Sequence, residues 1–182
     1  ARFPFSSSDH VSYFPFQLVH CDVWTSPVIS MSGYQYYLML HDDYSHFAWT
    51  FPLRHKSDVL LTIKHFHTFV RCHFHLNILT MQTDNGREFD NNASRAFFSS
   101  EGIQLRLSCP YTSPQNGRAE RILRTLNDIT RSLLVNASIP YTFWVEALNT
   151  ATFLLNRRPC RARHNHTPFY LLYGVLPVYS AV

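Results

Sequence analysis

The chain has 182 residues, 46% of them hydrophobic and 15% aromatic, which is enough for one buried core and excludes an intrinsically disordered segment. Its apolar runs are only a few residues long, so the sequence excludes a membrane-spanning helix. The 16 basic and 12 acidic residues give a net charge of +4, and all the basic residues except Lys56 and Lys64 are Arg. Since Arg suits bidentate phosphate contacts, this charge favours an anionic polymer as partner.

The first part of the chain predicts a linker, a strand and a hairpin. Residues 1–13 are rich in serine and show no periodicity, which is typical of a linker. The apolar run from Phe16 to Trp24 predicts a strand that contains Asp22, and a carboxylate there is costly unless it is paired or bound to a metal. Tyr36–Leu40 and Phe47–Leu53 predict a hairpin around Asp42 and Asp43, for which turn capping is favoured over metal binding.

The middle of the chain alternates between helical and strand patterns. Ser57-Asp58 is a good helix start, and apolar residues follow at 59, 60, 63, 66, 69 and 70, which is helical spacing. Ile78–Thr83 predicts a strand with Asp84 at its carboxyl end, where open α/β sheets bind ligands. A short helix over Asn91–Gly102 and a strand over Gln104–Cys109 complete this part.

The last part of the chain predicts a loop and two helices. Pro110–Gly117 contains prolines, amides and a glycine, which predicts a mobile loop. A long amphipathic helix is then expected from Arg118 to Asn136, with Glu120 in its first turn, where the helix dipole favours an ionised carboxylate. Tyr141–Arg157 predicts a final helix. These elements together predict one mixed sheet covered by helices.

Asp22, Asp84 and Glu120 are three carboxylates, each placed where a predicted strand or helix would hold it rigidly, and 35 residues lie between the last two. Hard oxygen ligands suit Mg²⁺ and Mn²⁺, and a pair of such ions can activate a nucleophile and stabilise a leaving oxygen in phosphate chemistry. We therefore expect the three carboxylates to converge within metal-bridging reach.

The surrounding sequence resembles the catalytic core of retroviral-type integrases, specifically those of copia-type LTR retrotransposons in plants, from about Phe5 to Tyr179. The motifs that carry the resemblance are His20-Cys21-Asp22-Val23-Trp24, Asp42-Asp43-Tyr44-Ser45, Asp84-Asn85-Gly86-Arg87-Glu88-Phe89, residues 110–121, Phe143-Trp144-Val145-Glu146-Ala147, Leu155-Asn156-Arg157 and Thr167-Pro168.

The resemblance implies an α/β fold of the ribonuclease H-like class, with a mixed five-stranded sheet flanked by helices. It implies that Asp22, Asp84 and Glu120 form the catalytic, metal-binding triad for two Mg²⁺ or Mn²⁺ ions when DNA is bound, with Asp22 bridging them. The implied chemistry is trimming of DNA 3′ ends by water, followed by attack of the 3′-hydroxyl on a target phosphodiester.

Further implications concern partners and organisation. Double-stranded DNA, as element ends and target, would be the partner of a homo-oligomer that does not bind membranes. The implied DNA contacts are Gln115, Asn116, Gly117, Arg118, Arg121, Arg124 and Asn127. Function in the nucleus, after a virus-like particle stage in the cytoplasm, is expected. Residues 1–9 would be a linker after a zinc module, 10–177 the core, and 178–182 the start of a C-terminal region.

Two positions depart from the pattern of the family. Ile122 stands where many copia-type integrases have Lys, and it belongs to the apolar face of its helix. His75 stands where relatives often end the first long helix with Gly, and His is a poorer residue for a left-handed cap.

Three alternative interpretations remain open from the sequence. His65, His67, Cys72, His73 and His75 lie close together along the chain, but His65 and His67 point about 200° apart on a helix, so solvent-facing histidines are favoured over a zinc site. The chain could also be an inactive nucleic-acid-binding remnant of a retroelement. A ribonuclease H or Holliday-junction nuclease on the same fold is the third alternative.

Overall fold

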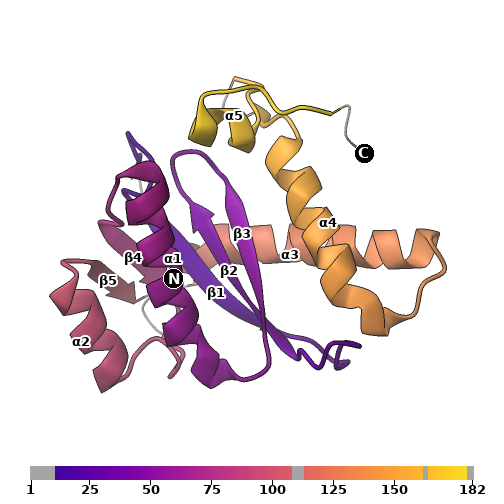
Figure 1. The fold of residues 1–182 in the computed structure, drawn as a ribbon, viewed down its shortest axis with the longest axis horizontal. Helices are drawn as coiled ribbons and strands as arrows, with labels where there is room; N and C mark the ends of the chain where they lie inside the picture. Colours follow the sequence, from indigo (N-terminus) through magenta and orange to yellow (C-terminus); the bar gives the residue numbers. More distant parts are fainter. Residues whose placement is uncertain (1–10, 108–112, 162–163, 180–182) are drawn as a thin grey trace, which may run out of the picture.

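The sheet of this protein has five strands in the spatial order β3-β2-β1-β4-β5 (Figure 1). A computed structural model describes residues 11–107, 113–161 and 164–179. The strands are β1 (Val19–Thr25), β2 (Tyr36–Asp42), β3 (Ala48–Leu53), β4 (Thr80–Thr83) and β5 (Gln104–Leu107). β1, β2 and β3 pair antiparallel, whereas β4 is parallel to β1 and to β5. The predicted mixed five-stranded sheet is therefore confirmed.

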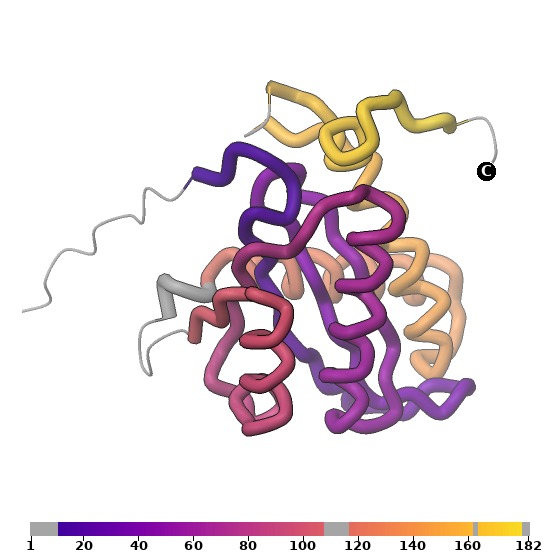
Figure 2. Tube along the Cα trace, turned by 60° about the vertical axis from the view of Figure 1, so that its left-hand side comes forward, coloured from indigo at the N-terminus to yellow at the C-terminus, as the bar shows by residue number. Residues whose placement is uncertain are grey.

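One face of the sheet is covered by α1 (Val59–Phe74), which follows the short 3₁₀ helix η1 (Lys56–Asp58). Ile63, Phe66 and Val70 recur at helical spacing and pack on the sheet with Cys21 and Leu40. Figures 1 and 2 both show α1 on this side, and α2 (Asn92–Ser100) beside the edge strand β5. The side chains of this face form the larger of two cores.

The opposite face is covered by α3 (Ser113–Asn136) and α4 (Trp144–Arg157), which pack on each other and on the sheet. Their core contains Ala119, Leu126 and Leu148 from the helices and Tyr37 and Met39 from β2. A 3₁₀ helix, η2 (Tyr141–Phe143), precedes α4, and the short α5 (Pro168–Tyr173) packs against α4. Alternate residues of β1 thus face different helices, and Asp22, opposite Met39 in the register, faces α3.

The start of α3 differs from the prediction. The helix begins at Ser113 and not at Arg118, so Ser113–Gly117 is helical, although a loop was predicted there. Pro114 causes no break because proline is tolerated in the first turn of a helix, where its missing N–H would have no partner anyway. Residues 110–112 of the predicted loop, and Cys109 of the predicted strand, lie outside the described residues.

The start of α1 and the presence of α5 also differ from the prediction. At the predicted helix start, Ser57-Asp58, the carboxylate of Asp58 accepts the N–H of His55 at 3.0 Å. Asp58 is the N-cap residue of α1, but its side chain makes no capping hydrogen bond to that helix. α5 was not predicted, although Thr167 caps it by accepting the N–H of Tyr170 and Pro168 opens it, which is a recognisable start signal. Among the described residues, no helix is both long and apolar enough to cross a membrane.

Candidate active site

Asp22 lies in the centre of β1 on the face that α3 covers, and its side chain is partly buried. Its Oδ1 accepts the backbone N–H of Val23 at 2.8 Å. The strand therefore presents a carboxylate between the sheet and a helix, where few groups can neutralise it. This position agrees with the predicted mid-strand location.

Asp84 directly follows β4, so it lies at the carboxyl end of a strand that is parallel to β1 and next to it. Its Oδ1 accepts the N–H of Gly86 at 3.0 Å. A Cβ on Gly86 would lie 2.8 Å from Cδ of Glu88 and 2.9 Å from Oδ1 of Asp84, so the turn brings these two carboxylates to the same glycine. Glu88, held by Lys56 at 3.2 Å, is a member of this site that the sequence analysis did not single out.

Glu120 is exposed on α3, but it does not lie in the first turn of that helix. Because α3 begins at Ser113, Glu120 lies about two turns into the helix. The predicted position of Glu120 in the first turn, next to the positive end of the helix dipole, is therefore wrong.

The negative charges of the site act on the pKa of Asp22. Burial raises its pKa, and the negative charges of Asp84, Glu120 and Glu88 raise it further, against the hydrogen bond from Val23, so that the pKa reaches about 7. Like charges that act on one another in this way form a region of strongly negative potential. Such a region attracts a cation, and carboxylate oxygens are the ligands that Mg²⁺ and Mn²⁺ prefer.

The three carboxylates influence one another without forming a closed ligand set. Within the described part of the chain, no three His, Cys, Asp or Glu side chains are grouped so that they could hold a metal ion. The expected convergence within metal-bridging reach is therefore not present. Burial and repulsion between like charges, which both raise the pKa of Asp22, oppose a tighter arrangement of these anions unless a cation lies among them. The donor set itself still fits a hard divalent cation.

Asp42 and Asp43 have different roles. Asp42 caps its turn as predicted, because its carboxylate accepts the N–H and hydroxyl of Ser45, and it also accepts the N–H of Phe16. Asp43 instead bonds to His20, Arg118 and Ser12. Burial disfavours the charge of Asp43, but the His20 hydrogen bond, the Arg118 charge and the Ser12 hydroxyl together hold its pKa well below its usual range.

The predicted DNA contacts differ in whether their side chains are exposed or already paired within the protein. Arg121 and Arg124 are exposed on α3, although Nε of Arg121 donates to the carbonyl of Gly117. Arg118 is paired with Asp43, and the side-chain oxygen of Asn127 accepts the hydroxyl of Tyr37 at 3.0 Å. Gln115 and Asn116 lie in the first turn of α3, and their side chains lie outside the described residues.

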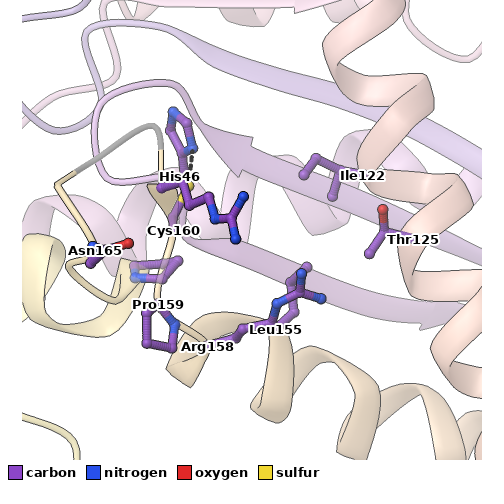
Figure 3. Close-up of a pocket in the computed structure, with 10 residues that line it drawn as sticks. His46, Ile122, Thr125, Leu155, Arg158, Pro159, Cys160 and Asn165 are labelled. Carbon is purple, nitrogen blue, oxygen red and sulfur yellow. Dashed lines mark hydrogen bonds between the residues drawn. The ribbon is translucent and has the colours of Figure 1, made fainter.

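A cavity of about 740 Å³ lies on the other side of α3 from Glu120. Ile122 and Thr125 face Arg158, Pro159 and Cys160 across it, and His46 closes one end (Figure 3). Sγ of Cys160 lies 3.7 Å from Nδ1 of His46. Ile122 is half-buried and packs with the core of this face, as predicted. The cavity therefore borders the helix that carries Glu120 without containing any of the three carboxylates.

The histidines of α1 do not form a zinc site in the described residues. His65, His73 and His75 are exposed, as predicted. His67 is not, because its imidazole is 3% exposed and its Nε2 lies 3.2 Å from Oε2 of Glu101. The helical pattern alone did not reveal this, since the partner comes from the end of α2.

Residues 13–113 match the family described as Integrase core domain. The chain is 36% identical, over 179 residues, to the Retrovirus-related Pol polyproteins from transposons RE2 and RE1 of Arabidopsis thaliana. It is 34% identical over 159 residues to the corresponding polyprotein from transposon TNT 1-94 of Nicotiana tabacum. These matches cover 98%, 98% and 87% of the chain but only 12% of each relative, so the chain spans about an eighth of their length.

Solved structures share the fold at low sequence identity. A chain of the simian T-cell lymphotropic virus intasome in complex with PP2A regulatory subunit B56 gamma gives a TM-score of 0.73 at 16% identity, covering 95% of this chain and 61% of that one. The HTLV-2 integrase catalytic core domain, solved in complex with magnesium in a trimeric form, gives 0.64 at 18% identity, covering 88% and 98%. The predicted ribonuclease H-like fold class is thereby confirmed.

Proposed function

Because the chain belongs to the integrase core domain family, we propose that it is the catalytic core of a retrotransposon integrase that processes DNA 3′ ends and joins them to target DNA. The observation that carries this proposal is the coupling of Asp22 to Asp84 and Glu120 across three different elements. Both steps are in-line phosphoryl transfers, in which positioning and charge stabilisation supply most of the catalysis.

Asp22, Asp84 and Glu120 would hold the divalent ions, two of them when DNA is bound. Bound Mg²⁺ or Mn²⁺ would polarise the scissile phosphate, activate the attacking oxygen and stabilise the leaving one. The chain itself must deliver Asp22 as a carboxylate. Because the pKa of Asp22 is about 7 without a cation, metal binding and proton loss at Asp22 are coupled.

Double-stranded DNA is the proposed substrate. Arg121 and Arg124 project from the helix that carries Glu120, and their guanidinium groups can contact phosphates. A homo-oligomer is supported by two relatives of the fold, one named as part of an intasome and one as a trimeric form. Action on nuclear DNA would require the nucleus as the site of function, after a stage in a cytoplasmic virus-like particle.

The test is strand joining by purified protein carrying Asp84→Asn or Glu120→Gln. We expect each substitution to lower Mg²⁺-dependent disintegration-type joining by at least about a thousandfold, since each removes a metal ligand. The far-ultraviolet circular dichroism and the melting temperature should be retained, because Glu120 is exposed and Asp84 lies outside the strand.

Asp128→Asn is the matched control, because Asp128 is exposed on the same helix and pairs with the exposed Arg131. Its joining rate should equal that of the unmodified protein. Equal joining by all four proteins would refute the triad. Absence of joining, with DNA binding retained, would favour an inactive remnant, and cleavage of RNA–DNA hybrids without joining would favour a ribonuclease H-like nuclease.

A further inference from the structure

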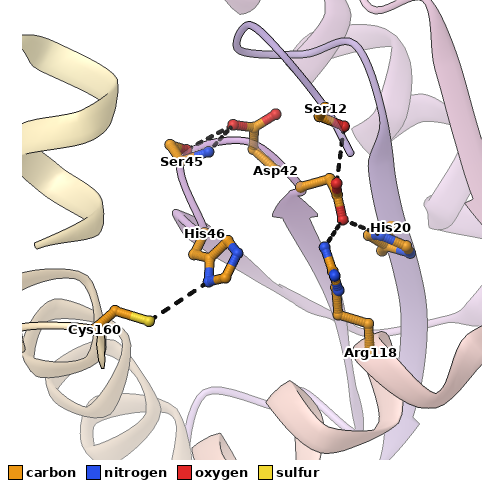
Figure 4. Close-up of polar contacts among 8 residues, drawn as sticks. Ser12, His20, Asp42, Ser45, His46, Arg118 and Cys160 are labelled. Carbon is orange, nitrogen blue, oxygen red and sulfur yellow. Dashed lines mark hydrogen bonds and ion pairs between the residues drawn. The ribbon is translucent and has the colours of Figure 1, made fainter. Parts of the chain in front are cut away.

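A buried carboxylate, Asp43, joins the strand that carries Asp22 to the helix that carries Glu120. Its Oδ1 lies 3.0 Å from Nε2 of His20 and pairs with the guanidinium of Arg118. Its Oδ2 accepts the hydroxyl of Ser12 at 2.8 Å. The labelled side chains of Ser12, His20 and Arg118 converge on this carboxylate in Figure 4, and only 3% of the Asp43 side chain is exposed.

The partners of Asp43 lie at fixed offsets from the proposed metal ligands. His20 precedes Asp22 by two residues, and Arg118 precedes Glu120 by two. Side chains two residues apart in a strand share a face, so His20 and Asp22 both face α3. His20 also pairs across the sheet with Gln82, which precedes Asp84 by two residues. His20 and Gln82 therefore lie two residues from Asp22 and Asp84 on neighbouring strands, whereas Arg118 and Glu120 project from α3 on the two sides of the buried Ala119.

In the described first half of α3, Ala119, Ile122 and Leu123 pack in the core that also contains Tyr37 and Met39 of the sheet. These contacts are apolar and therefore non-directional. The ion pair between Arg118 and Asp43 is directional, so it adds a contact that can fix the rotation of the helix. Because an unpaired buried carboxylate is costly, this pair resists opening.

We propose that Asp43 and Arg118 are positioning residues, which fix the rotation of α3 and so hold Glu120 toward Asp22. This inference rests on the proposed function, since it assigns a purpose to the placement of Glu120. It reassigns Arg118, which the sequence analysis counted among the DNA contacts. Its guanidinium pairs with a buried carboxylate although the side chain is 39% exposed, whereas Arg121 and Arg124 are exposed and form no ion pair with a described carboxylate.

The test measures metal binding and DNA binding separately in Arg118→Met, Arg118→Lys and Asp43→Asn. Mn²⁺ titration followed by electron paramagnetic resonance gives the metal midpoint, and fluorescence anisotropy with a duplex gives the DNA Kd. In Arg118→Met we expect the Mn²⁺ midpoint to rise about tenfold, as for outer partners of metal ligands, with less than about a twofold change in Kd. Arg118→Lys should recover most of the midpoint.

Asp43→Asn should raise the midpoint as Arg118→Met does, and the double variant should be no worse than either single one, because the two residues act as a unit. Arg121→Met should give the reverse pattern, in which DNA binding is weaker and the midpoint of the Mn²⁺ titration is unchanged. Arg131→Met controls for loss of an exposed ion pair on the same helix and should change neither quantity.

The inference is overturned if Arg118→Met raises the DNA Kd like Arg121→Met and leaves the Mn²⁺ midpoint unchanged, since Arg118 would then be a DNA contact. Failure of the proposed function gives a different result, namely no metal-dependent joining or no Mn²⁺ binding by the unmodified protein. In that case amide hydrogen exchange decides the inference. Faster exchange confined to the first half of α3 in Arg118→Met supports a positioning role, and unchanged exchange refutes it.

Discussion

Asp22 is destabilising for the folded chain when no cation is bound, because folding buries its carboxyl group and brings it toward other carboxylates. Its pKa of about 7 lies well above its ordinary value of 3.8. Between these two values the folded state binds more protons than the unfolded state, so the free energy of unfolding decreases as the pH rises through this window. Asp22 contributes no such penalty below about pH 4.

We therefore predict that Asp22→Asn raises the free energy of unfolding at pH 8 by about 1–3 kcal/mol, discounted for the partial exposure of the site, and changes little at pH 4. Urea unfolding at both pH values measures this difference. Mg²⁺ should stabilise the unmodified protein at pH 8 and not the variant. An equal gain at both pH values would show that the effect of the substitution is unrelated to charge.

At the scale of elements, the end of α1 carries a residue poorly suited to its conformation. His75 has φ 55° and ψ 31°, which is the left-handed region that the sequence analysis anticipated from the glycine of relatives. Its side chain is exposed, so no packing compensates for the strain. The helix therefore ends at His75 despite that residue, because the following chain must turn back toward β4.

His75→Gly should raise the free energy of unfolding by about 1 kcal/mol, since glycine adopts this conformation without the Cβ penalty. His65→Gly is the matched control, because His65 is also exposed but lies inside α1, where glycine should cost about 1 kcal/mol. Thermal or urea unfolding of both variants measures the two effects. A loss of stability in both variants would contradict the assignment of a left-handed cap.

The elements also show which sequence signals carried information. Strand positions followed from apolar runs, and the capping residue Asn91 opens α2, where its side chain accepts the N–H of Ser94. The start of α3 was missed because proline, glycine and amides between 114 and 117 indicate a loop in isolation. Local propensity was overridden there by the packing of the rest of α3 on the sheet.

At the scale of the whole molecule, the charge is distributed unevenly. Asp22, Asp84, Glu88 and Glu120 gather at one site, whereas the sequence has no acidic residue after Glu146. Arg158 and Arg161 line the cavity beside α3 and are both exposed. A positive surface thus lies on the side of α3 away from Glu120, and a polyanion that also contacts this surface gains an attraction that offsets its repulsion by the acidic site.

The double variant Arg158→Gln/Arg161→Gln should weaken duplex binding and reduce the slope of log K against log salt by about 1–2, because up to two phosphate contacts are lost. Arg71→Gln/Arg95→Gln removes the same charge from arginines that are already paired with Glu101 and Asp90, and should leave the slope unchanged. Anisotropy at several salt concentrations measures both. Equal slopes for the two double variants would mean that only net charge matters.

The sequence by itself was sufficient for the order of the strands and of the helices up to α4 and for the family, because each is carried by local pattern or by short motifs. It also predicts Asp22, Asp84 and Glu120 as the candidate carboxylates. It could not supply the partners of those residues. Asp43 pairs with Arg118, which is 75 residues away in the sequence, and His67 lies next to Glu101, which is 34 residues away. No local sequence pattern predicts such pairs.

Only the tertiary structure decided how the site is supported and charged. Burial of Asp22 beside Asp84 and Glu120 depends on β1, β4 and α3 lying next to one another, and its pKa follows from that arrangement. The pair between Arg118, which the sequence analysis predicts as a DNA contact, and Asp43 depends on the same arrangement of segments. The sequence specifies the functional group of each side chain, but the electrostatic surroundings of that group come from segments that are brought together only when the chain folds.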